Sequence, residues 1–522
     1  MISIIPKPNS ITDLNEVISI STFSMVGFNG YEKATKRFLA LFGGFLDDEA
    51  LYKISLKIEP SKNNKAYLKN LESYSLEVTK DETIIKTSSE NGAYYALVSL
   101  TQIIKKEDNN LKLNLCIIND APHFKFRSFS LDECRHFFGK EEVKKIIDEL
   151  SNLKINYLHW HLSDDQGFRV DFKKFPLLKK IGSVRKGTKI NNVSGPDYEL
   201  KEYGYSYSEE DILEVIEYAK ERFISIIPEF DMPGHTKSII ASYPHLHCEN
   251  KQVEVFDGIC GNYDILCVGK DSTYEFLKDF WFEVLRLFKD SKYIHIGGDE
   301  VITTNWENCS DCNRVLKEMG YQNHHELQGY FSNKLINEVL NESNKNIIMW
   351  HDGITDYTNK DVILQYWVWQ MDQDGIRKIN EGRPTIYSPC SQCYFDAPYA
   401  ELPLSRTYNR GIKLDGLTKK GLASIFGMES CMWTEFIREN RLLEYMIFPR
   451  LHAFSESAWT HKKNRNYEDF LTRLDYHYKL LDEKNICYAS KEIIDRLDKD
   501  EEISKIFRNT DRYIEMKLDN KE

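Results

Sequence analysis

No apolar stretch of this 522-residue sequence approaches the roughly 18 residues that a membrane-spanning helix needs. Long blocks of like charge are also missing, and at a net charge of −12 the chain would repel the phosphates of a nucleic acid. The N-terminus, Met1 to Lys7, lacks a charged start followed by a sustained apolar segment, so it does not predict a signal peptide. We therefore expect a protein of the cytoplasm that binds neither membranes nor nucleic acid.

The cysteines lack the spacing of a disulfide framework, and their number, 11, is odd. In a large chain without an export signal this favours reduced thiols. Cys309 and Cys312 form a close pair, and a structural zinc site could include them together with others such as Cys248 or Cys260. The spacing alone is weak support for a metal, so this question stays open.

Two hydrophobic patterns divide the chain. Apolar and polar residues alternate at 52–58 and 73–78, and a helical segment follows at 92–103, which predicts a small α+β domain over residues 1–120. From about residue 124, apolar strands alternate with amphipathic helices, as in a (β/α)8 TIM barrel. We expect the barrel over 121–460 and a helical C-terminal extension over 461–522. The predicted barrel strands are 127–131, 156–162, 223–228, 292–296, 346–350, 362–367, 384–388 and 424–428.

The most informative segment runs from Tyr293 to Glu300. A short apolar run ends at a glycine pair, and Asp299 and Glu300 follow at once. Strands end in this way where the chain turns sharply and presents acidic side chains to a cleft. Two carboxylates pressed together cannot both ionise freely, so we expect one of them to hold a proton near neutral pH. Since an enzyme needs such a proton to protonate a leaving group, the pattern predicts acid-assisted bond cleavage.

Polar and aromatic residues also follow the other predicted strands, at the end where a barrel carries its active site. In chain order they are Asp132, Arg135, Asp164, Asp165, Glu229, Asp231, His235, Trp350, Asp352, Trp367, Tyr394, Asp396, Glu429, Trp433 and Glu435. Scattered surface charges would not collect at one end of every unit. The sequence therefore predicts that these side chains meet in one site.

Several ordered segments resemble the β-N-acetylhexosaminidases of glycoside hydrolase family 20. They are the Tyr293–Glu300 segment, LDECRHF, HWHLSDDQGFR, PEFDMPGH and the late MWTE. The resemblance covers roughly residues 124–460, and the small N-terminal domain also fits that family's layout. It implies an exo-acting hydrolase that removes terminal β-linked N-acetylglucosamine or N-acetylgalactosamine from an oligosaccharide or glycoconjugate. It implies no cofactor and no metal in the catalytic site.

The adjacent carboxylates restrict the mechanism. Common retaining glycosidases place two carboxylates about 5 Å apart on opposite sides of the scissile bond. Asp299 and Glu300 are neighbours in sequence, so we do not expect them to flank the bond in this way. In the family that the chain resembles, the sugar's own 2-acetamido oxygen attacks and forms an oxazolinium intermediate. The resemblance implies that Glu300 protonates the leaving oxygen and later deprotonates water, while Asp299 holds the acetamido N–H.

Four further residues are assigned by the same resemblance. Asp164 and His235 match a pair that orders and tunes the acid. Arg135 and Glu435 match residues that grip the hydroxyls of the terminal sugar, and a charged pair there would enforce exo attack by closing one end of the site. Taken alone, His235 would more often be a structural histidine after the Pro233-Gly234 turn, and Arg135 could equally be a salt-bridged surface residue.

The sugar pocket is assigned in the same way. Trp350, Trp367 and Trp433 match tryptophans that wall the acetamido group and stack under the sugar, although each alone could simply pack in a core. Tyr394 matches a tyrosine that donates to the acetamido oxygen, and Asp396 matches a residue that contacts the sugar.

Three alternatives remain open at this point. A disaccharide-releasing relative would need space beyond the terminal sugar, which Arg135 and Glu435 would block. A non-catalytic sugar-binding protein on the same barrel would usually have lost the acid, and Glu300 is present. The many Asp and His residues at the strand ends also allow a metal-dependent hydrolase. The sequence leaves open the preferred sugar, the natural substrate and the oligomeric state.

Overall fold

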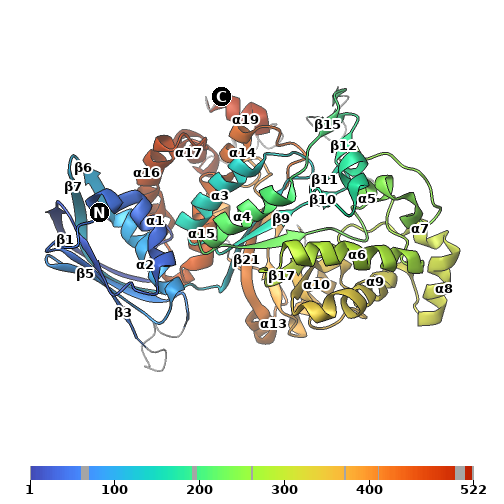
Figure 1. Ribbon diagram of the computed structural model, residues 1–522, viewed down its shortest axis with the longest axis horizontal. Coiled ribbons are helices and arrows are strands. Elements are labelled where there is room, and N and C mark those ends of the chain that lie inside the picture. Colours follow the sequence, from blue (N-terminus) through green and yellow to red (C-terminus); the bar gives the residue numbers. More distant parts are fainter. Residues whose placement is uncertain are drawn as a thin grey trace.

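The computed structural model describes residues 2–59, 70–190, 197–259, 263–368, 372–409, 411–499 and 512–519. A mixed β-sheet domain and a closed barrel lie end to end, and the C-terminal helices lie above the junction between them in the view of Figure 1. Among the described residues, no helix combines the length and the apolar character needed to cross a bilayer.

The N-terminal domain is a mixed sheet covered by two helices. Its strands are β1 (Ser10–Ile20), β2 (Ser24–Val26), β3 (Lys53–Ile58), β4 (Tyr74–Val78), β5 (Glu82–Thr87), β6 (Ile104–Glu107) and β7 (Asn110–Asp120). They follow the order β1-β7-β4-β5-β3-β2, with β6 paired to β7. The helices α1 (Glu32–Phe42) and α2 (Glu90–Ile103) pack on each other, and Ser89 caps α2 by accepting the N–H of Gly92. The expected α+β fold of this part of the chain is confirmed.

The eight predicted barrel strands are present and close into a parallel barrel in the order β16-β17-β18-β19-β20-β21-β8-β9. They are β8 (Phe126–Asp132), β9 (Tyr157–His161), β16 (Ser225–Glu229), β17 (Tyr293–His295), β18 (Asn346–Trp350), β19 (Ile363–Tyr366), β20 (Thr385–Tyr387) and β21 (Ile425–Met432). Most are short runs of buried side chains, as parallel strands covered on both faces require. The predicted TIM barrel is therefore confirmed.

The barrel interior changes from apolar to polar along its axis. One end is filled by a small cluster of buried apolar side chains, namely Phe126, Ile227, Ile348, Ile363 and Ile386. A buried polar layer lies nearer the carboxyl ends of the strands, where His159 contacts Glu429 at 2.9 Å and Glu229 at 3.1 Å. Since buried charges need partners, this layer forms a fixed charged base beneath the active-site end.

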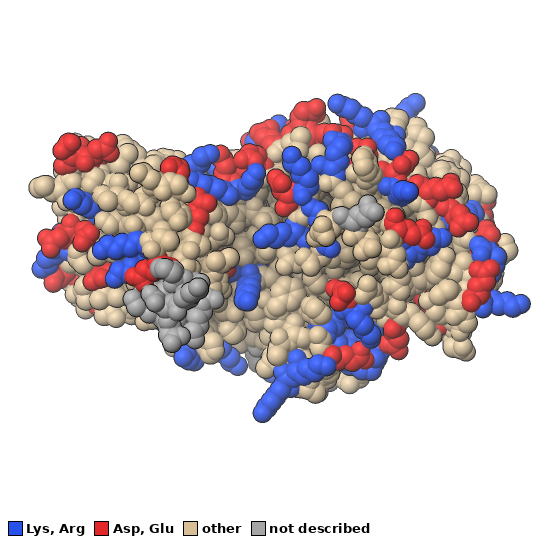
Figure 2. All heavy atoms as spheres, turned by 60° about the horizontal axis from the view of Figure 1, so that its bottom comes forward, with Lys and Arg blue, Asp and Glu red and all other residues tan. Residues whose placement is uncertain are grey.

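Amphipathic helices surround the barrel. The longer ones are α3 (Lys140–Asn152), α4 (Glu209–Lys220), α6 (Asp271–Leu287), α8 (Ser310–Met319), α9 (Leu327–Leu335), α10 (Gln373–Asn380), α14 (Asn440–Ile447) and α15 (Arg450–Trp459). In α3, for example, Val143, Ile146, Ile147 and Leu150 face the core at helical spacing. Lysine and arginine are interspersed with acidic residues over the face shown in Figure 2, without one dominant sign.

The C-terminal residues form α16 (Tyr467–Glu483), α17 (Lys491–Lys499) and α19 (Arg512–Leu518). Buried Arg473 of α16 makes a bidentate contact with Glu456 of α15, with both N–O distances 2.8 Å, and donates to the carbonyl of Ile4 at 2.7 Å. These charge-assisted bonds tie the chain's first residues to the barrel helices. A second buried pair, Arg127 with Glu72 at 2.8 Å, joins the first barrel strand to the N-terminal domain.

Candidate active site

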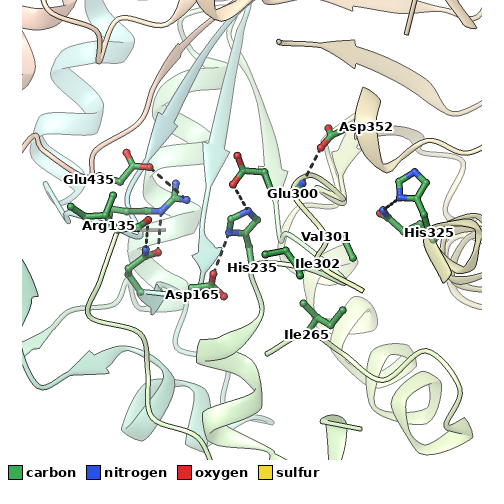
Figure 3. Close-up of a pocket in the computed structure, with 14 residues that line it drawn as sticks. Arg135, Asp165, His235, Ile265, Glu300, Val301, Ile302, His325, Asp352 and Glu435 are labelled. Carbon is green, nitrogen blue, oxygen red and sulfur yellow. Dashed lines mark hydrogen bonds and ion pairs between the residues drawn. The ribbon is translucent and has the colours of Figure 1, made fainter. Parts of the chain in front are cut away.

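A cavity of about 580 Å³ opens at the carboxyl ends of the strands. In Figure 3, Arg135 and Glu435 lie on one side, His235 and Glu300 in the centre, and Asp352 on the far side. The cavity is further lined by Asp165, Gln166, Gly234, Ile259, Ile265, Val301, Ile302, His325 and Gln328. The predicted convergence of strand-end residues is therefore found for Arg135, His235, Glu300 and Glu435, which all line this one space.

The glycine pair after β17 turns the chain so that Asp299 and Glu300 enter the site. Gly297 and Gly298 have φ values of +66° and +102°. A Cβ on Gly297 would lie 1.7 Å from a carboxylate oxygen of Asp231, so no other residue fits there. The N–H of Gly298 donates to the same oxygen of Asp231 at 2.8 Å, which fixes the turn to β16 and its following loop.

Asp299 and Asp231 form a coupled carboxyl pair that resists carrying two charges. Burial, followed by the neighbouring carboxylate of Asp231, raises the pKa of Asp299 well above the usual range, and burial also raises that of Asp231. Oδ1 of Asp299 is buried and has no hydrogen-bond partner among the described residues. The sequence-based expectation that Asp299 and Glu300 press on each other is thus wrong in one respect, because the carboxylate that perturbs Asp299 is Asp231 from the loop after β16.

Glu300 has the opposite environment. Its side chain is 57% exposed, and its Oε2 lies 3.6 Å from Nε2 of His235. This contact with His235 lowers the pKa of Glu300, although burial partly opposes the effect. The backbone N–H of Glu300 donates to Asp352 at 2.9 Å, and its φ of +52° is a strained conformation for glutamate. Asp352 thus holds the main chain while the side chain stays free in the cavity.

A chain of side-chain contacts connects Asp164 to Glu300 through His235. Asp164 lies 3.2 Å from Nδ1 of His235, 2.9 Å from Arg135 and 2.8 Å from His161. Burial opposes ionisation of Asp164, but Arg135 and His235 outweigh it and hold its pKa well below the usual value. Burial also opposes the charge on His235, but Asp164 outweighs it and raises the pKa of the imidazole well above 6.5.

Arg135 and Glu435 meet at one end of the cavity. Arg135 is buried and held by Asp132 at 3.2 Å, by Gln166 at 3.0 Å and by Asp164, and its NH2 group lies 3.8 Å from Glu435. Burial raises the pKa of Glu435 to about 7, although the Arg135 guanidinium opposes this shift. The two side chains therefore offer a fixed cation and a titratable acid next to each other.

The aromatic residues predicted for the pocket form one continuous group. The ring of Trp433 lies 5.8 Å from that of Trp350 and 6.2 Å from that of Tyr394, and Tyr394 stacks on Trp367 at 6.3 Å. Trp350 is fully buried and donates its indole N–H to Glu229 at 2.8 Å, whereas Trp367 donates to Asp352 at 2.8 Å. Burial raises the pKa of Tyr394 well above 10, so its phenol keeps the proton it would donate.

Asp396 is less embedded in this group than the other predicted residues. Burial raises its pKa to about 6, and its Oδ1 has no hydrogen-bond partner in the part of the chain that the structure describes. Arg512 of the C-terminal helix α19 lies 4.0 Å from its other oxygen. This contact could not be predicted, because Arg512 and Asp396 are far apart in the sequence.

Asp231 and Asp352 were recognised in the sequence as strand-end residues but received no role. In the structure each contacts the backbone that carries the two central carboxylates, Asp231 at Gly298 and Asp352 at Glu300. Their position directly after β16 and β18 was the signal available in the sequence. What was missing was the pairing of those strands with β17, which brings both carboxylates against the same turn.

Two family models and several known proteins match this chain. The family model described as "Glycosyl hydrolase family 20, catalytic domain" matches residues 124–462, and that of "domain 2" of the same family matches residues 1–121. A β-hexosaminidase of Vibrio furnissii is 31% identical over 484 residues, covering 88% of this chain and 76% of that protein. One from Porphyromonas gingivalis is 30% identical over 93% of this chain, which spans only 64% of that longer protein.

Solved structures show the same architecture. The exo β-N-acetylglucosaminidase of Vibrio harveyi, in complex with N-acetylglucosamine, aligns with a TM-score of 0.81 at 28% identity. The alignment covers 94% of this chain and 78% of the Vibrio chain.

Proposed function

Because the chain belongs to glycosyl hydrolase family 20, we propose that it removes a terminal β-linked N-acetylglucosamine or N-acetylgalactosamine from an oligosaccharide or glycoconjugate, with the sugar's acetamido oxygen as nucleophile. The family match confirms the resemblance drawn from the sequence and the expected glycosidase of the β-hexosaminidase type. The N-acetylglucosamine bound by the Vibrio harveyi relative supports the same class of sugar here.

The contrast between Asp299 and Glu300 is the observation that carries the mechanism. Glu300 projects into the cavity beside the protonated His235, where it can give a proton to the leaving oxygen and later take one from water. A bound sugar would remove water from its exposed carboxylate, and this desolvation raises the pKa towards that of a useful acid. Asp299 is buried beside it with one unpartnered oxygen, which suits a group that accepts the acetamido N–H.

The aromatic group supports attack by the acetamido oxygen. Trp367, Tyr394 and Trp433 are partly buried neighbours around the space next to Asp299, and a dry aromatic wall would hold the acetamido group against the anomeric carbon. Tyr394 would donate its phenol hydrogen to the attacking oxygen. As the oxazolinium ring forms, positive charge develops on the nitrogen. The proton of the carboxyl pair would then stay on Asp231, so that ionised Asp299 would stabilise this charge.

Arg135 and Glu435 support an exo mode of attack. Arg135 is fixed by three buried partners and cannot swing away without losing its contacts with Asp132, Gln166 and Asp164. Its guanidinium and the neighbouring Glu435 would hydrogen-bond the hydroxyls of a terminal ring and leave little space for a further sugar.

Rates on paired substrates test this function directly. We expect an aryl β-N-acetylglucosaminide to be hydrolysed with a kcat/KM at least about 10³-fold above that of the matching aryl β-glucoside, because only the first carries the nucleophile. Equal rates on the two substrates, or a trapped glycosyl ester on a protein side chain, would refute the proposed mechanism. In a second arm, a glycan that ends in β-linked N-acetylglucosamine should release that single sugar, and release of the terminal disaccharide from a lacto-type glycan would favour the alternative activity.

A further inference from the structure

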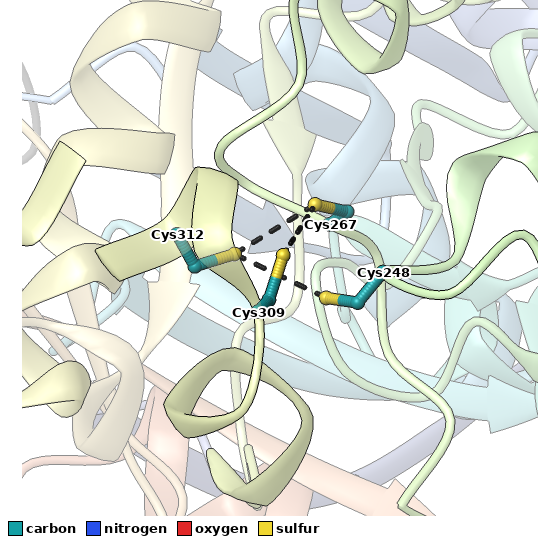
Figure 4. A group of neighbouring side chains, drawn as sticks. All are labelled: Cys248, Cys267, Cys309 and Cys312. Carbon is teal, nitrogen blue, oxygen red and sulfur yellow. Dashed lines mark hydrogen bonds between the residues drawn. The ribbon is translucent and has the colours of Figure 1, made fainter. Parts of the chain in front are cut away.

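Four cysteine sulfurs from separate segments converge beside the active site. Cys248 follows the short helix at Pro244–Leu246, Cys267 precedes α6, and Cys309 and Cys312 lie at the start of α8. Their ligand atoms all lie within 4.8 Å of one another (Figure 4). The sequence singled out Cys309, Cys312 and Cys248, but Cys267 takes the fourth position. The other suggested partner, Cys260, lies outside the described residues.

The sulfur–sulfur distances match a tetrahedral metal site. Sγ of Cys267 lies 3.7 Å from Sγ of both Cys309 and Cys312, and Sγ of Cys248 lies 4.0 Å from that of Cys312. Four sulfurs placed about 2.3 Å from a central zinc ion are about 3.8 Å apart. A disulfide would require about 2.05 Å, so these pairs are not bonded to each other in this conformation.

The four cysteines are largely shielded from solvent. Cys267, Cys309 and Cys312 are buried, and Cys248 is partly buried. The N-terminus of α8 carries Cys309 as its cap and Cys312 in its first turn, where the helix dipole stabilises anionic sulfur.

We propose that Cys248, Cys267, Cys309 and Cys312 bind one structural zinc ion. Four thiolates in a closed tetrahedron are the ligand set that zinc takes in structural sites, without an open position for catalysis. The proposal answers the question that the Cys309–Cys312 pair left open in the sequence, and it does not depend on the catalytic roles proposed above.

The ion would join the two connections that carry the acid and its histidine. Cys248 and Cys267 lie on the connection after β16, which also carries His235, whereas Cys309 and Cys312 lie on the connection after β17, which carries Glu300. Direct hydrogen bonds also join these connections. They include Trp306 Nε1 to the carbonyl of Leu266 at 2.8 Å and Asn305 Nδ2 to that of Tyr263 at 2.6 Å. Coordination to one zinc ion would cross-link the two connections and so hold His235 next to Glu300.

The backbone around the four cysteines is closely packed, as expected for a preformed metal site. Gly269, which lies just after Cys267, contacts the first turn of α8 so closely that a Cβ there would lie 2.3 Å from the backbone of Asp311. Arg314 of α8 donates to the carbonyl of Gly269 at 2.9 Å, and Thr273 donates to that of Cys267 at 2.8 Å. The loop that bears Cys267 is therefore held against α8 with little freedom.

Metal analysis of the full-length protein, purified without chelators or a metal-affinity tag, tests the proposal. We expect about one zinc ion per chain by inductively coupled plasma mass spectrometry. A mercurial that modifies thiols should release this zinc to a colorimetric chelator, in step with the loss of about four thiolates. Less than about 0.1 metal ion per chain, iron in place of zinc, or disulfides among the four cysteines by mass spectrometry would overturn the assignment.

Cysteine variants test whether these four residues, and not other cysteines, bind the zinc. The double variant Cys309→Ser, Cys312→Ser should lose the zinc, and its Tm should fall by at least about 5 °C. The milder Cys248→Ser variant, at the partly buried ligand, should bind zinc more weakly and lose it first to a competing chelator. Cys390→Ser with Cys393→Ser is the matched control, because it removes a buried pair of the same spacing outside the cluster and should keep the full zinc content. Loss of zinc in this control but not in the first variant would refute the proposed ligands.

Discussion

The pKa values of two neighbouring carboxyl groups shift in opposite directions, one at the buried base of the active site and one at its open rim. At the base, Asp299 is desolvated next to Asp231, and its pKa rises well above the usual range. At the rim, Glu300 is more than half exposed next to His235, and its pKa falls. These two groups are adjacent in the sequence, so burial and the nearest charge determine their proton affinities, and adjacency does not. The comparison predicts that similar substitutions at the two positions will have different consequences.

The largest effect is expected from Glu300→Gln. The amide cannot transfer a proton, so turnover of a substrate with a poor leaving group should fall by about 10²–10⁴-fold. An aryl substrate whose leaving group needs no protonation should be affected much less, and N-acetylglucosamine should still bind. Steady-state kinetics with leaving groups of graded pKa would measure this difference.

The matched control is Glu217→Gln, an exposed residue on α4 away from the cavity, which should keep wild-type kinetics. Near-normal turnover of the poor substrate by Glu300→Gln would remove Glu300 as the acid. An equal loss on all leaving groups would point to a binding or folding defect instead.

Asp299→Asn should lower turnover by about 10²–10³-fold, because the variant cannot supply negative charge to the developing oxazolinium. Its Tm at pH 7 should change little, since the Asp231–Asp299 pair disfavours two charges and an uncharged amide can take the place of one carboxyl. Thermal unfolding measured together with kinetics would check both parts. A large fall in Tm with retained turnover would show that the charge of Asp299 stabilises the fold and does not serve catalysis. That result would contradict the raised pKa of Asp299 at the base of the site. Asp290→Asn, on an exposed loop, serves as control.

The barrel could be predicted from the sequence because its signals are local. Each strand is a short apolar run, and β18, predicted at 346–350, is found there without any shift in its ends. The polar residues after the strands were visible for the same reason. The cytoplasmic location, the domain boundaries and the assigned catalytic roles stay predictions.

The pairing of side chains from distant segments could not be predicted. The proton was expected within the Asp299–Glu300 pair, whereas the partner of Asp299 comes from the loop after β16. In the same way Cys267 joins Cys309 only because two connections fold over each other, and Arg512 reaches Asp396 through the C-terminal helix. In each case the spacing in the sequence carries no information about the contact. Residues that act through a neighbour in space were therefore missed, although residues that follow a strand were found.

Glu435, beside Arg135 at one end of the cavity, gives a smaller, pH-dependent effect. Burial raises its folded-state pKa to about 7 from the usual 4.5, so between these values the folded protein binds more protons than the unfolded chain. The contribution of Glu435 to stability is therefore lost as pH rises from about 4.5 through 7. Relative to Glu435→Gln, the wild type should lose up to a few kcal/mol of unfolding free energy between pH 5 and 8. Urea unfolding at a series of pH values would measure this, and parallel curves for the two proteins would contradict it.

The smallest effect is expected from Trp367→Phe, which keeps an aromatic wall but removes one hydrogen bond. The indole N–H of Trp367 donates to Asp352, whose other oxygen accepts the backbone N–H of Glu300. Loss of one such bond is worth about 1 kcal/mol, so kcat/KM should fall by roughly fivefold. Because Asp352 acts on Glu300 through the main chain, the fall should lie mainly in kcat and be larger for poor leaving groups. If only KM changed, and equally for all leaving groups, Trp367 would act as a sugar-stacking surface alone, and the rim would not depend on Asp352 to position its acid.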